Sequence, residues 1–229
     1  MNLASAYPNV LRHLESWSGH GVLSDVMNQF PDLQVFLAGG VIRNCLLDAS
    51  RPVRDFDFLL DGPSIAPALD IIARHGLLEK TPFGSPRWHP AGDPECYADL
   101  IPIRDFRPGL WQCEDIVDVL NQFDYTASAL AFNVRTGDSY NPQNGVRDIT
   151  RRTMRMVRFD FPEEPFRPGT PLTRNAILWF RVLHYATVLD LTVEPLTLQW
   201  LRGHRAFQEQ LETFAALFFK PCDGYLERL

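Results

Sequence analysis

Two aspartates, Asp55 and Asp57, have the types and spacing that most directly indicate chemistry. They lie in RDFDFLL (54–60), whose alternation of charged and apolar residues predicts a strand. Because residues i and i+2 of a strand project from one face, the two carboxylates point together, and Phe56 and Phe58 point to the other face. Neighbouring carboxylates repel unless a cation lies between them, and all-oxygen ligands favour Mg²⁺. The pair therefore predicts a magnesium site; the alternative is an exposed acidic pair bound to nearby arginines.

A glycine pair precedes these aspartates at the end of another expected strand. LQVFLA (33–38) is a short apolar run that predicts a strand, Gly39 and Gly40 follow it, and VIRNCLLDA (41–49) has helical apolar spacing. Backbone N–H groups at a strand-to-helix turn form an anion site that suits phosphate. A tight turn without a ligand is the alternative, but its place beside a metal-binding strand favours a bound triphosphate.

A third acid, Asp99, lies inside the expected strand YADLIPI (97–103). A carboxylate without a partner is costly in an apolar strand, and two-metal nucleotidyl transfer uses three carboxylates. Two hold the ion that grips the triphosphate; the third helps to hold the ion that activates the attacking hydroxyl, or accepts its proton. Asp55, Asp57 and Asp99 thus predict a two-metal site for Mg²⁺ or Mn²⁺. An edge-strand aspartate facing water is the alternative for Asp99.

The rest of the chain supplies the elements that must position these residues. Apolar periodicity, turn residues and prolines define them. The expected elements are helices within 4–30, broken near Gly19 and Gly21, a helix over 63–75, a loop over 81–95, a hairpin over 130–142 with its turn at 136–138, and a last strand within 153–157.

A proline-punctuated segment (159–171) separates this mixed part of the chain from a stretch of helical spacing (172–219). The sequence therefore predicts an α+β domain over 1–158, followed over 159–229 by a linker and a small helical region.

Composition limits the class of protein. The 229 residues include 45% hydrophobic side chains, enough for a packed core. A formal net charge of −6 argues against a protein that coats nucleic acid by bulk electrostatics. Lys80 and Lys220 are the only lysines, and arginine suits bidentate phosphate binding, although a compositional bias would give the same pattern.

Targeting signals and cysteine usage indicate the cytoplasm. No apolar run is long enough to span a membrane, and the first residues lack a secretory pattern. The four cysteines show no metal-ligand spacing, which is typical of free thiols in a reducing compartment.

The segment from 36 to 60 resembles the head domain shared by class II CCA-adding tRNA nucleotidyltransferases and bacterial poly(A) polymerases, a branch of the DNA polymerase beta superfamily. The family has a strand, two glycines, an arginine followed by Asp or Asn, an Asp-x-Asp pair, and later an acid followed five residues on by arginine. A further block, QFDYTASALAFNVRTGDSYNPQNGVRDI, is similar to the family segment that follows. The matching positions in the first part and the start of this block are Gly39, Gly40, Arg43, Asn44, Asp55, Asp57, Asp99, Arg104 and Asp124.

The resemblance implies a nucleotidyltransferase head with a mixed sheet flanked by helices. Asp55 and Asp57 would hold Mg²⁺, Asp99 would be the third carboxylate, and the triphosphate would lie against the glycine turn. Arg43 and Asp124 would help to seat the nucleotide. The implied reaction is attack by an acceptor hydroxyl, such as an RNA or tRNA 3′ end, on the α-phosphate, with release of pyrophosphate.

Departures from the family pattern limit that expectation. The family's two arginines before the aspartate of the second block are Gln122 and Phe123, and its later asparagine is Ser128. The E-D-x-x-R stretch that selects CTP and ATP aligns with Arg174, Asn175 and Leu178, which argues against CCA templating. The family's helical body and tail also have no counterpart here, so we expect the chain to find its acceptor differently, to use a protein partner or a second copy, or no longer to act on tRNA.

Other residues have a structural and a functional interpretation. Trp88 and His89 can anchor the loop or stack on a base, and His184 lies on an apolar helical face as a core residue. The basic stretch can be a solvated face or contact an RNA backbone; it comprises Arg147, Arg151, Arg152, Arg155 and Arg158. Two alternatives to an RNA-modifying enzyme remain: a non-catalytic or regulatory nucleotide-binding protein, and a nucleotidyltransferase with a protein or small-molecule acceptor.

Overall fold

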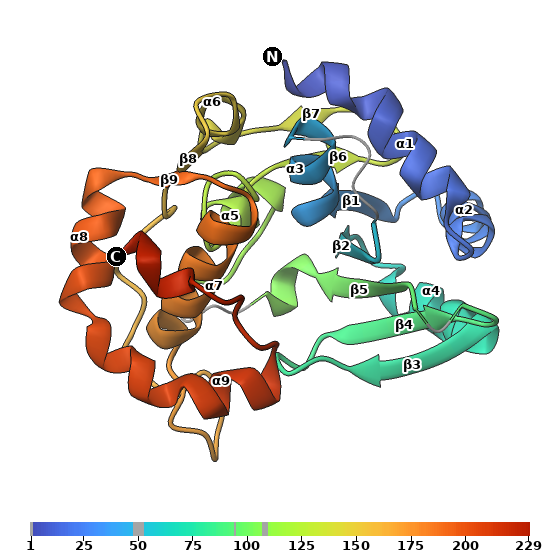
Figure 1. Ribbon diagram of the computed structural model, residues 1–229. Helices are drawn as coiled ribbons and strands as arrows, with labels where there is room; N and C mark the ends of the chain where they lie inside the picture. Colours follow the sequence, from blue (N-terminus) through green and yellow to red (C-terminus); the bar gives the residue numbers. More distant parts are fainter. Residues whose placement is uncertain (1, 48–52, 94, 107–109) are drawn as a thin grey trace.

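A computed structural model describes residues 2–47, 53–93, 95–106 and 110–229. Within these residues, seven strands form one mixed sheet in the order β3-β4-β5-β2-β1-β6-β7 (Figure 1). The strands of this sheet are β1 (Gln34–Ala38), β2 (Asp55–Asp61), β3 (Gly76–Lys80), β4 (Pro86–Pro90), β5 (Tyr97–Pro102), β6 (Ala131–Asn133) and β7 (Ser139–Tyr140).

Helices flank the sheet and form most of the C-terminal part of the chain, which gathers on one side of the molecule (Figure 1). They are α1 (Tyr7–Ser16), α2 (His20–Gln29), α3 (Gly40–Leu47), α4 (Ile65–Ile72), α5 (Ile116–Leu120), α6 (Gly145–Thr150), α7 (Arg174–Val188), α8 (Pro195–Gly203) and α9 (Leu211–Leu217). Short 3-10 helices span Leu3–Ala6, Ala73–His75, Ile103–Asp105, Arg205–Gln210 and Tyr225–Arg228. A mixed sheet flanked by helices confirms the predicted fold class.

Strand β2 lies at the centre of the sheet, antiparallel to β1 and parallel to β5. Its side chains alternate between two apolar clusters, as the sequence pattern predicts. Phe56 and Phe58 enter the main core, whereas Leu59 joins a second cluster with Phe36 and Ala38. Asp55 and Asp57 therefore lie on the face of the second cluster, beyond its apolar residues.

The main core also receives helices from both halves of the chain. Val10 and Leu14 of α1, Ile42 of α3, and Ile177 and Phe180 of α7 belong to the same buried cluster. Helix α7 begins at Thr173, whose side chain accepts the N–H of Ala176 as an N-cap. The helical region thus packs directly against the sheet-bearing part, while the division into domains at 1–158 and 159–229 stays a prediction.

The structure corrects the expected loop over 81–95. Residues 86–90 form β4, which pairs with β3 and β5, and β3 itself was not predicted. The loop was predicted because this segment is rich in proline. Pro86 and Pro90, however, stand at the two ends of the strand, where proline is tolerated. Trp88 between them is fully buried against the main core, so its structural interpretation is confirmed.

Smaller elements also differ from the expectations. Helix α5 was missed because its five residues are too few to show a helical period. The strand expected within 153–157 is the two-residue β8 (Thr153–Met154), which pairs with β9 (Thr192–Val193) outside the main sheet. The 136–138 turn connects β6 and β7 as predicted. The end of the expected 41–49 helix, at residues 48–49, lies outside the described residues.

Among the helices of the described residues, none is long and apolar enough to cross a membrane.

Candidate active site

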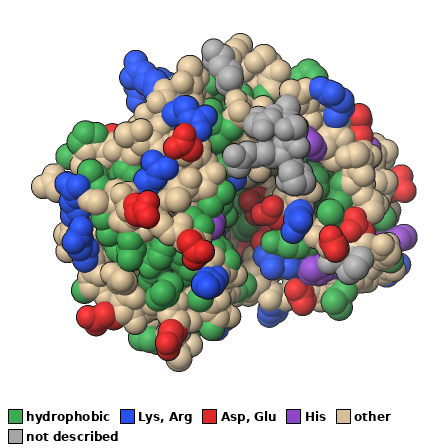
Figure 2. All heavy atoms as spheres, in the orientation of Figure 1, with side chains coloured by type: hydrophobic (Ala, Val, Ile, Leu, Met, Phe, Trp, Pro, Cys, Tyr) green, Lys and Arg blue, Asp and Glu red, His purple; other side chains and the backbone are tan. Residues whose placement is uncertain are grey.

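A row of four residues crosses the sheet at the same level. Ala38 of β1 lies opposite Asp57 of β2, Asp57 lies opposite Asp99 of β5, and Asp99 lies opposite Arg87 of β4. Residues directly opposite one another in a sheet share a face. The sequence prediction that Asp57 and Asp99 face one site is therefore met, and Asp55 lies two residues away on the same face. Figure 2 shows acidic side chains in a hollow near the middle of the molecule.

Asp57 carries the strongest electrostatic perturbation of the row. Its pKa is raised from 3.8 to about 7, first by burial and then by the neighbouring charges of Asp55 and Asp99, while Arg181 and Arg87 oppose the rise. Three carboxylates thus concentrate more negative charge than the two arginines offset. A divalent cation would relieve this repulsion, so the donor set fits a hard metal ion at Asp55 and Asp57.

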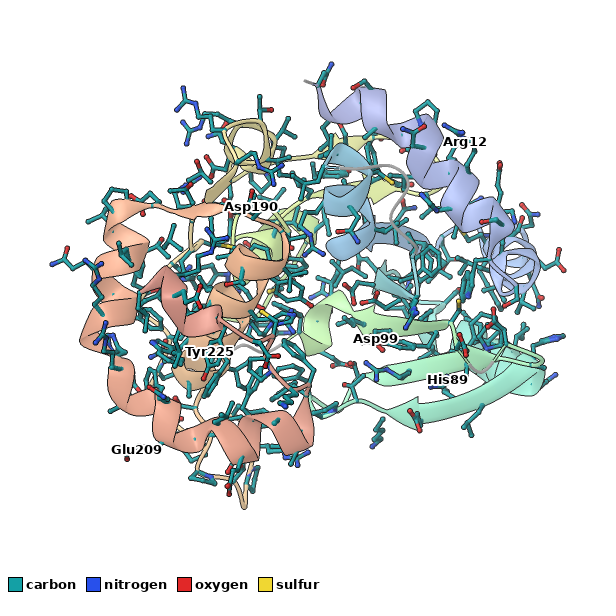
Figure 3. All side chains as sticks on the ribbon, in the orientation of Figure 1. Arg12, His89, Asp99, Asp190, Glu209 and Tyr225 are labelled. Carbon is teal, nitrogen blue, oxygen red and sulfur yellow. The ribbon has the colours of Figure 1, made fainter. Side chains whose placement is uncertain are left out.

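Asp99 is held by Arg87 in a two-point ion pair. The Arg87 Nε donates to Asp99 Oδ1 at 2.7 Å, and the second guanidinium nitrogen donates to Oδ2 at 2.9 Å. The guanidinium carbon lies 4.0 Å from the centroid of the Tyr97 ring. Figure 3 places Asp99 on β5 beside the β4 strand. Across the described ranges of the chain, no three acidic, histidine or cysteine side chains are arranged to hold a metal.

Gly39 brings the glycine turn into contact with the carboxylates. Its φ of +76° lies in the left-handed region. A Cβ added there would lie 2.8 Å from Asp57 Oδ2, so only glycine allows this approach. The N–H of Gly39 donates to the carbonyl of Leu130 at 3.1 Å. The N–H groups that could bind a phosphate are therefore those of the first turn of α3, which begins at Gly40.

Arg43, predicted to help seat a nucleotide, is buried behind this turn. It donates to the Tyr125 hydroxyl at 2.6 Å and the Ser128 hydroxyl at 3.0 Å, and also to the side-chain oxygen of Asn44. Its guanidinium carbon lies 5.0 Å from the centroid of the Tyr185 ring. Arg43 and Asn44 thus lie close to the glycine turn, and their mutual contacts brace α3 from within.

Asp124 is also buried and fully engaged. Arg174 donates to its Oδ1 at 2.6 Å, and Arg181 donates to its Oδ2. Burial alone would raise the pKa of Asp124, but the Arg181 and Arg174 guanidiniums hold it below its ordinary value. This cluster joins the segment before β6 to helix α7. The influence of Arg181 on both Asp57 and Asp124 shows that α7 borders the site.

Arg104 is not brought to the carboxylates. It follows the far end of β5, beyond Pro102, which lies opposite Leu60. At about 3.3 Å per residue, the strand separates this end from Asp99 by roughly 10 Å at Pro102 alone. Its exposed guanidinium pairs with Glu114.

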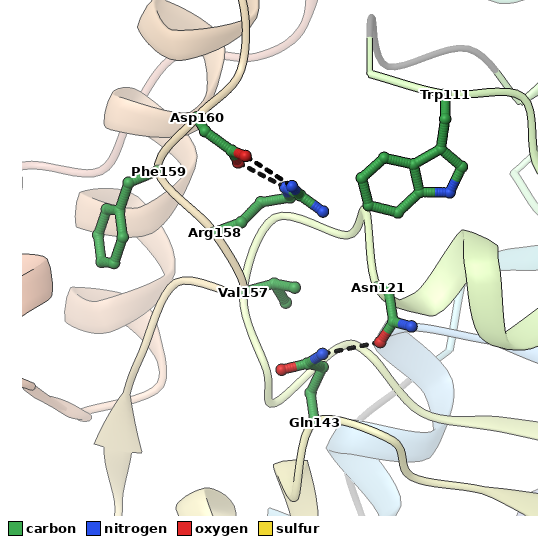
Figure 4. Close-up of a pocket in the computed structure, with 7 residues that line it drawn as sticks. All are labelled: Trp111, Asn121, Gln143, Val157, Arg158, Phe159 and Asp160. Atoms are coloured by element: carbon green, nitrogen blue, oxygen red, sulfur yellow. Dashed lines mark hydrogen bonds and ion pairs between the residues drawn. The ribbon is translucent and has the colours of Figure 1, made fainter.

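Two cavities of the described residues lie away from Asp55, Asp57 and Asp99, none of which lines either one. The larger, of about 620 Å³, lies between the segment before α5 and the segment after β8 (Figure 4). Its wall includes Trp111, over which Arg158 stacks at 4.4 Å while binding Asp160. The smaller, of about 380 Å³, includes Asp61 and Arg104 at the far end of β2.

The three residues that differ from the family pattern around Asp124 all make contacts within the protein. Gln122 is fully buried and donates to the carbonyl of Trp111 and to the sulfur of Cys113. Phe123 packs against the second apolar cluster, and Ser128 accepts from Arg43.

The positions aligned with the family's base-selecting stretch are internal as well. Arg174 is bound to Asp124, and Leu178 is fully buried. Asn175 donates to the carbonyl of Phe161 at 2.9 Å and to Glu163. His184 is half-buried and accepts the N–H of Cys222 at 3.0 Å, so the ring has a partner within the chain, and burial chiefly lowers its pKa to about 4.

The basic stretch 147–158 is mostly paired within the chain. Arg147 and Arg155 bind the buried Asp148, and Arg158 binds Asp160. Arg152 donates to the carbonyls of residues 189 and 190. These contacts favour the structural interpretation of the stretch.

Two residues of the site had no sequence signal. Arg87 stands in a proline-rich segment that gave no strand pattern, and its pairing with Asp99 depends on the register of β4. Arg181 lies among apolar residues of a helix, and only the packing of α7 brings it to Asp124.

Comparison with known proteins gives one consistent group. No protein-family model matches the chain. The chain is 32% identical over 182 residues to the multifunctional CCA protein of Acidovorax sp. (strain JS42), covering 74% of this chain and 38% of the relative. It is 28% identical over 183 residues to that of Stenotrophomonas maltophilia (strain R551-3), covering 77% and 42%. The chain thus spans less than half the length of these two relatives.

Solved structures share the fold. A tRNA nucleotidyltransferase complexed with a primer tRNA and an incoming ATP analog matches with a TM-score of 0.60 and 21% identity, over 83% of this chain and 52% of that one. A CCA-adding enzyme from Thermotoga maritima complexed with tRNA matches with a TM-score of 0.59 and 19% identity, over 96% and 47%. The chain is thus similar in sequence to multifunctional CCA proteins and shares the fold of CCA-adding tRNA nucleotidyltransferases.

Proposed function

We propose that this protein transfers a nucleoside monophosphate from a nucleoside triphosphate to the 3′ hydroxyl of an RNA. The observation that carries the proposal is the placement of Asp57 directly opposite Asp99, with Gly39 in contact range of the same carboxylate. A phosphate-binding turn and an acidic metal-binding strand thus meet at one point of the sheet. Nucleotidyl transfer needs both at the same place.

Each part of the site has a role in this reaction. The N–H groups of the first turn of α3 would orient the triphosphate. Asp55 and Asp57 would hold Mg²⁺, which when bound neutralises phosphate charge and favours departure of pyrophosphate. The arginines bound to Asp124 would fix α7 beside the nucleotide, since Arg181 lies close enough to influence Asp57.

The proposed step is a single in-line displacement. The oxygen of the acceptor hydroxyl forms a bond to the α-phosphorus, and the bond between that phosphorus and the bridging oxygen to the β-phosphate breaks. Pyrophosphate leaves with that bridging oxygen, and the hydroxyl proton passes to a site carboxylate or to water. Catalysis comes from positioning and charge neutralisation.

An RNA acceptor is supported by the relatives. One structural neighbour was solved with a primer tRNA and an ATP analog. The base-selecting positions differ here, because Arg174, Asn175 and Leu178 make internal contacts. The proposal is therefore nucleotide addition to RNA, without CCA templating.

A second candidate is a nucleotide-binding protein without turnover. The specific observation in its favour is that Arg87 binds both carboxylate oxygens of Asp99. If that pair excludes catalysis, the glycine turn and Asp55 with Asp57 would still bind a metal and a triphosphate.

A labelled transfer assay separates the two candidates. The protein is incubated with Mg²⁺, total RNA and each NTP, labelled in turn at the α- or the γ-phosphate. Enzymatic transfer predicts that the α-label enters RNA while the γ-label leaves as pyrophosphate. The Asp55→Asn/Asp57→Asn variant should abolish both events, and Asp61→Asn, at the far end of the same strand face, should preserve them. Nucleotide binding without release of pyrophosphate would contradict the enzymatic proposal.

A further inference from the structure

Arg87 is the charged residue of this row that neither the sequence pattern nor the family resemblance assigns. It stands opposite Asp99 in the antiparallel pairing of β4 with β5. Both ends of its guanidinium fork bind Asp99, at 2.7 Å and 2.9 Å. A two-point contact of this kind is a specific arrangement of arginine and carboxylate, which lysine cannot reproduce.

The pair is held firmly in place. The side chains of Arg87 and Asp99 are only 25% and 16% exposed. The Tyr97 ring lies 4.0 Å from the guanidinium carbon, a cation–π contact from the neighbouring strand. Strand β4 is hydrogen-bonded on both sides, to β3 and to β5. The sheet therefore holds the backbone of Arg87 in place.

The charges at the site then favour one metal ion. Asp55, Asp57 and Asp99 carry three negative charges when ionised, and Arg87 supplies one permanent positive charge. Arg87 is matched to Asp99 by the two-point pair, which leaves Asp55 and Asp57 as the donor pair for one divalent ion. A second divalent ion held by Asp99 would have to share that carboxylate with the guanidinium and would meet its positive charge.

We propose that Arg87 takes the place of a second metal ion, so that the site binds a single divalent cation at Asp55 and Asp57. Arg87 supplies fixed positive charge beside the acidic row and holds Asp99 in one orientation through its two-point contact. This inference rests on the proposed function, because it concerns the metal that the nucleotide reaction uses. It assigns Arg87 a positioning and electrostatic role that the family pattern gives to an ion.

Manganese binding tests the inference without measuring activity. The full chain is mixed with Mn²⁺ and a nonhydrolysable ATP, and the ions in the protein–nucleotide complex are counted by equilibrium dialysis. Electron paramagnetic resonance then shows whether the bound ions are magnetically coupled, as two ions about 3.5–4 Å apart would be. The wild-type protein should hold one uncoupled Mn²⁺ per chain.

Charge variants make the test specific. Arg87→Gln removes the charge and frees Asp99, so the count should rise to two and the spectrum should show a coupled pair. Arg87→Lys keeps the charge and should keep a single ion. Arg12→Gln on α1, away from Asp99 in Figure 3, removes an exposed arginine and should leave the count at one. Thermal melts of each variant establish that it is folded.

The outcomes separate the inference from the proposed function. Two coupled ions in the wild-type protein or in Arg87→Lys would overturn the role of Arg87 and leave nucleotidyl transfer standing. A single ion in folded Arg87→Gln would do the same. No Mn²⁺ in the wild-type complex would overturn both proposals. If Arg87→Gln does not fold, two coupled ions in the wild-type protein or in Arg87→Lys would still overturn the inference.

Discussion

Asp57 lies directly opposite Asp99 in the parallel pairing of β2 with β5. The Asp57 carboxylate also lies beside Gly39: a Cβ added to Gly39 would be 2.8 Å from Asp57 Oδ2. Asp57 therefore connects Asp99 on the neighbouring strand β5 with the glycine turn that starts α3. The predictions below follow from it and from the buried cluster around Asp124.

Replacing Gly39 with alanine should damage both stability and ligand binding. The φ of +76° costs a non-glycine residue roughly 1–2 kcal/mol, and the new methyl group would collide with Asp57 Oδ2 at 2.8 Å. Urea unfolding and Mn²⁺–nucleotide titration would measure the two losses.

Gly40→Ala is the matched control for this change. Its added methyl group has Arg43 as its nearest neighbour, at 3.4 Å, and its backbone is already helical. We expect this variant to retain stability and to bind more tightly than Gly39→Ala. Equal losses in the two variants would contradict the assigned contact between Gly39 and Asp57.

Asp57→Asn should stabilise the metal-free protein in a pH-dependent way. The native pKa of Asp57 is raised to about 7 from 3.8, so the native state keeps a proton between these values that the unfolded state releases. The wild-type protein therefore loses stability as pH rises from about 4 to 7, by up to about 4 kcal/mol before solvent screening reduces it.

Denaturant unfolding in the presence of a chelator checks this prediction at several pH values. Asparagine is neutral throughout, so the variant should gain over the wild-type protein as pH rises to 7, and the difference should be constant above it. The same difference at pH 4 and pH 8 would mean that Asp57 is not in a repulsive carboxylate cluster. The stabilised variant should also lose nucleotide transfer.

Asp124→Asn should destabilise the protein strongly. The change leaves Arg174 and Arg181 without their shared carboxylate, and breaking a buried ion pair costs about 3–5 kcal/mol. The pKa of Asp124 is held below its ordinary value, so this contribution is present above about pH 4 and is lost as pH falls through the native pKa.

The matched control is Asp160→Asn. Asp160 also binds an arginine at two points, but its side chain is 65% exposed. Exposed pairs contribute about 0–1 kcal/mol, so urea unfolding at pH 7 should separate the two variants clearly. A small loss in Asp124→Asn would show that the cluster does not hold α7 against the sheet.

The sequence predicted the parts of the site that depend on local pattern. Alternation around Asp55 and Asp57 fixed which face they share, and the apolar run before Gly39 located the turn. Asp99 was assigned from its place in an apolar strand, and the parallel register with β2 confirmed that it faces Asp57.

Contacts between residues far apart in the sequence could not be predicted from local pattern. The pairing of Arg87 with Asp99 requires β4 to lie beside β5, and prolines concealed β4 as a strand. Arg104 was predicted to bind the nucleotide from the family spacing; it follows the end of β5 and pairs with Glu114. The partners of Asp124 come from α7, 50 and 57 residues further along the chain.

The most direct test is a crystal structure of the protein with Mn²⁺ and a nonhydrolysable ATP, using the anomalous signal to locate the metal. The account predicts one Mn²⁺ bound by Asp55, Asp57 and the triphosphate, with the phosphates against the first turn of α3 and Arg87 still on Asp99. A triphosphate bound away from the Gly39–Gly40 turn, or a metal that does not touch Asp57, would contradict it.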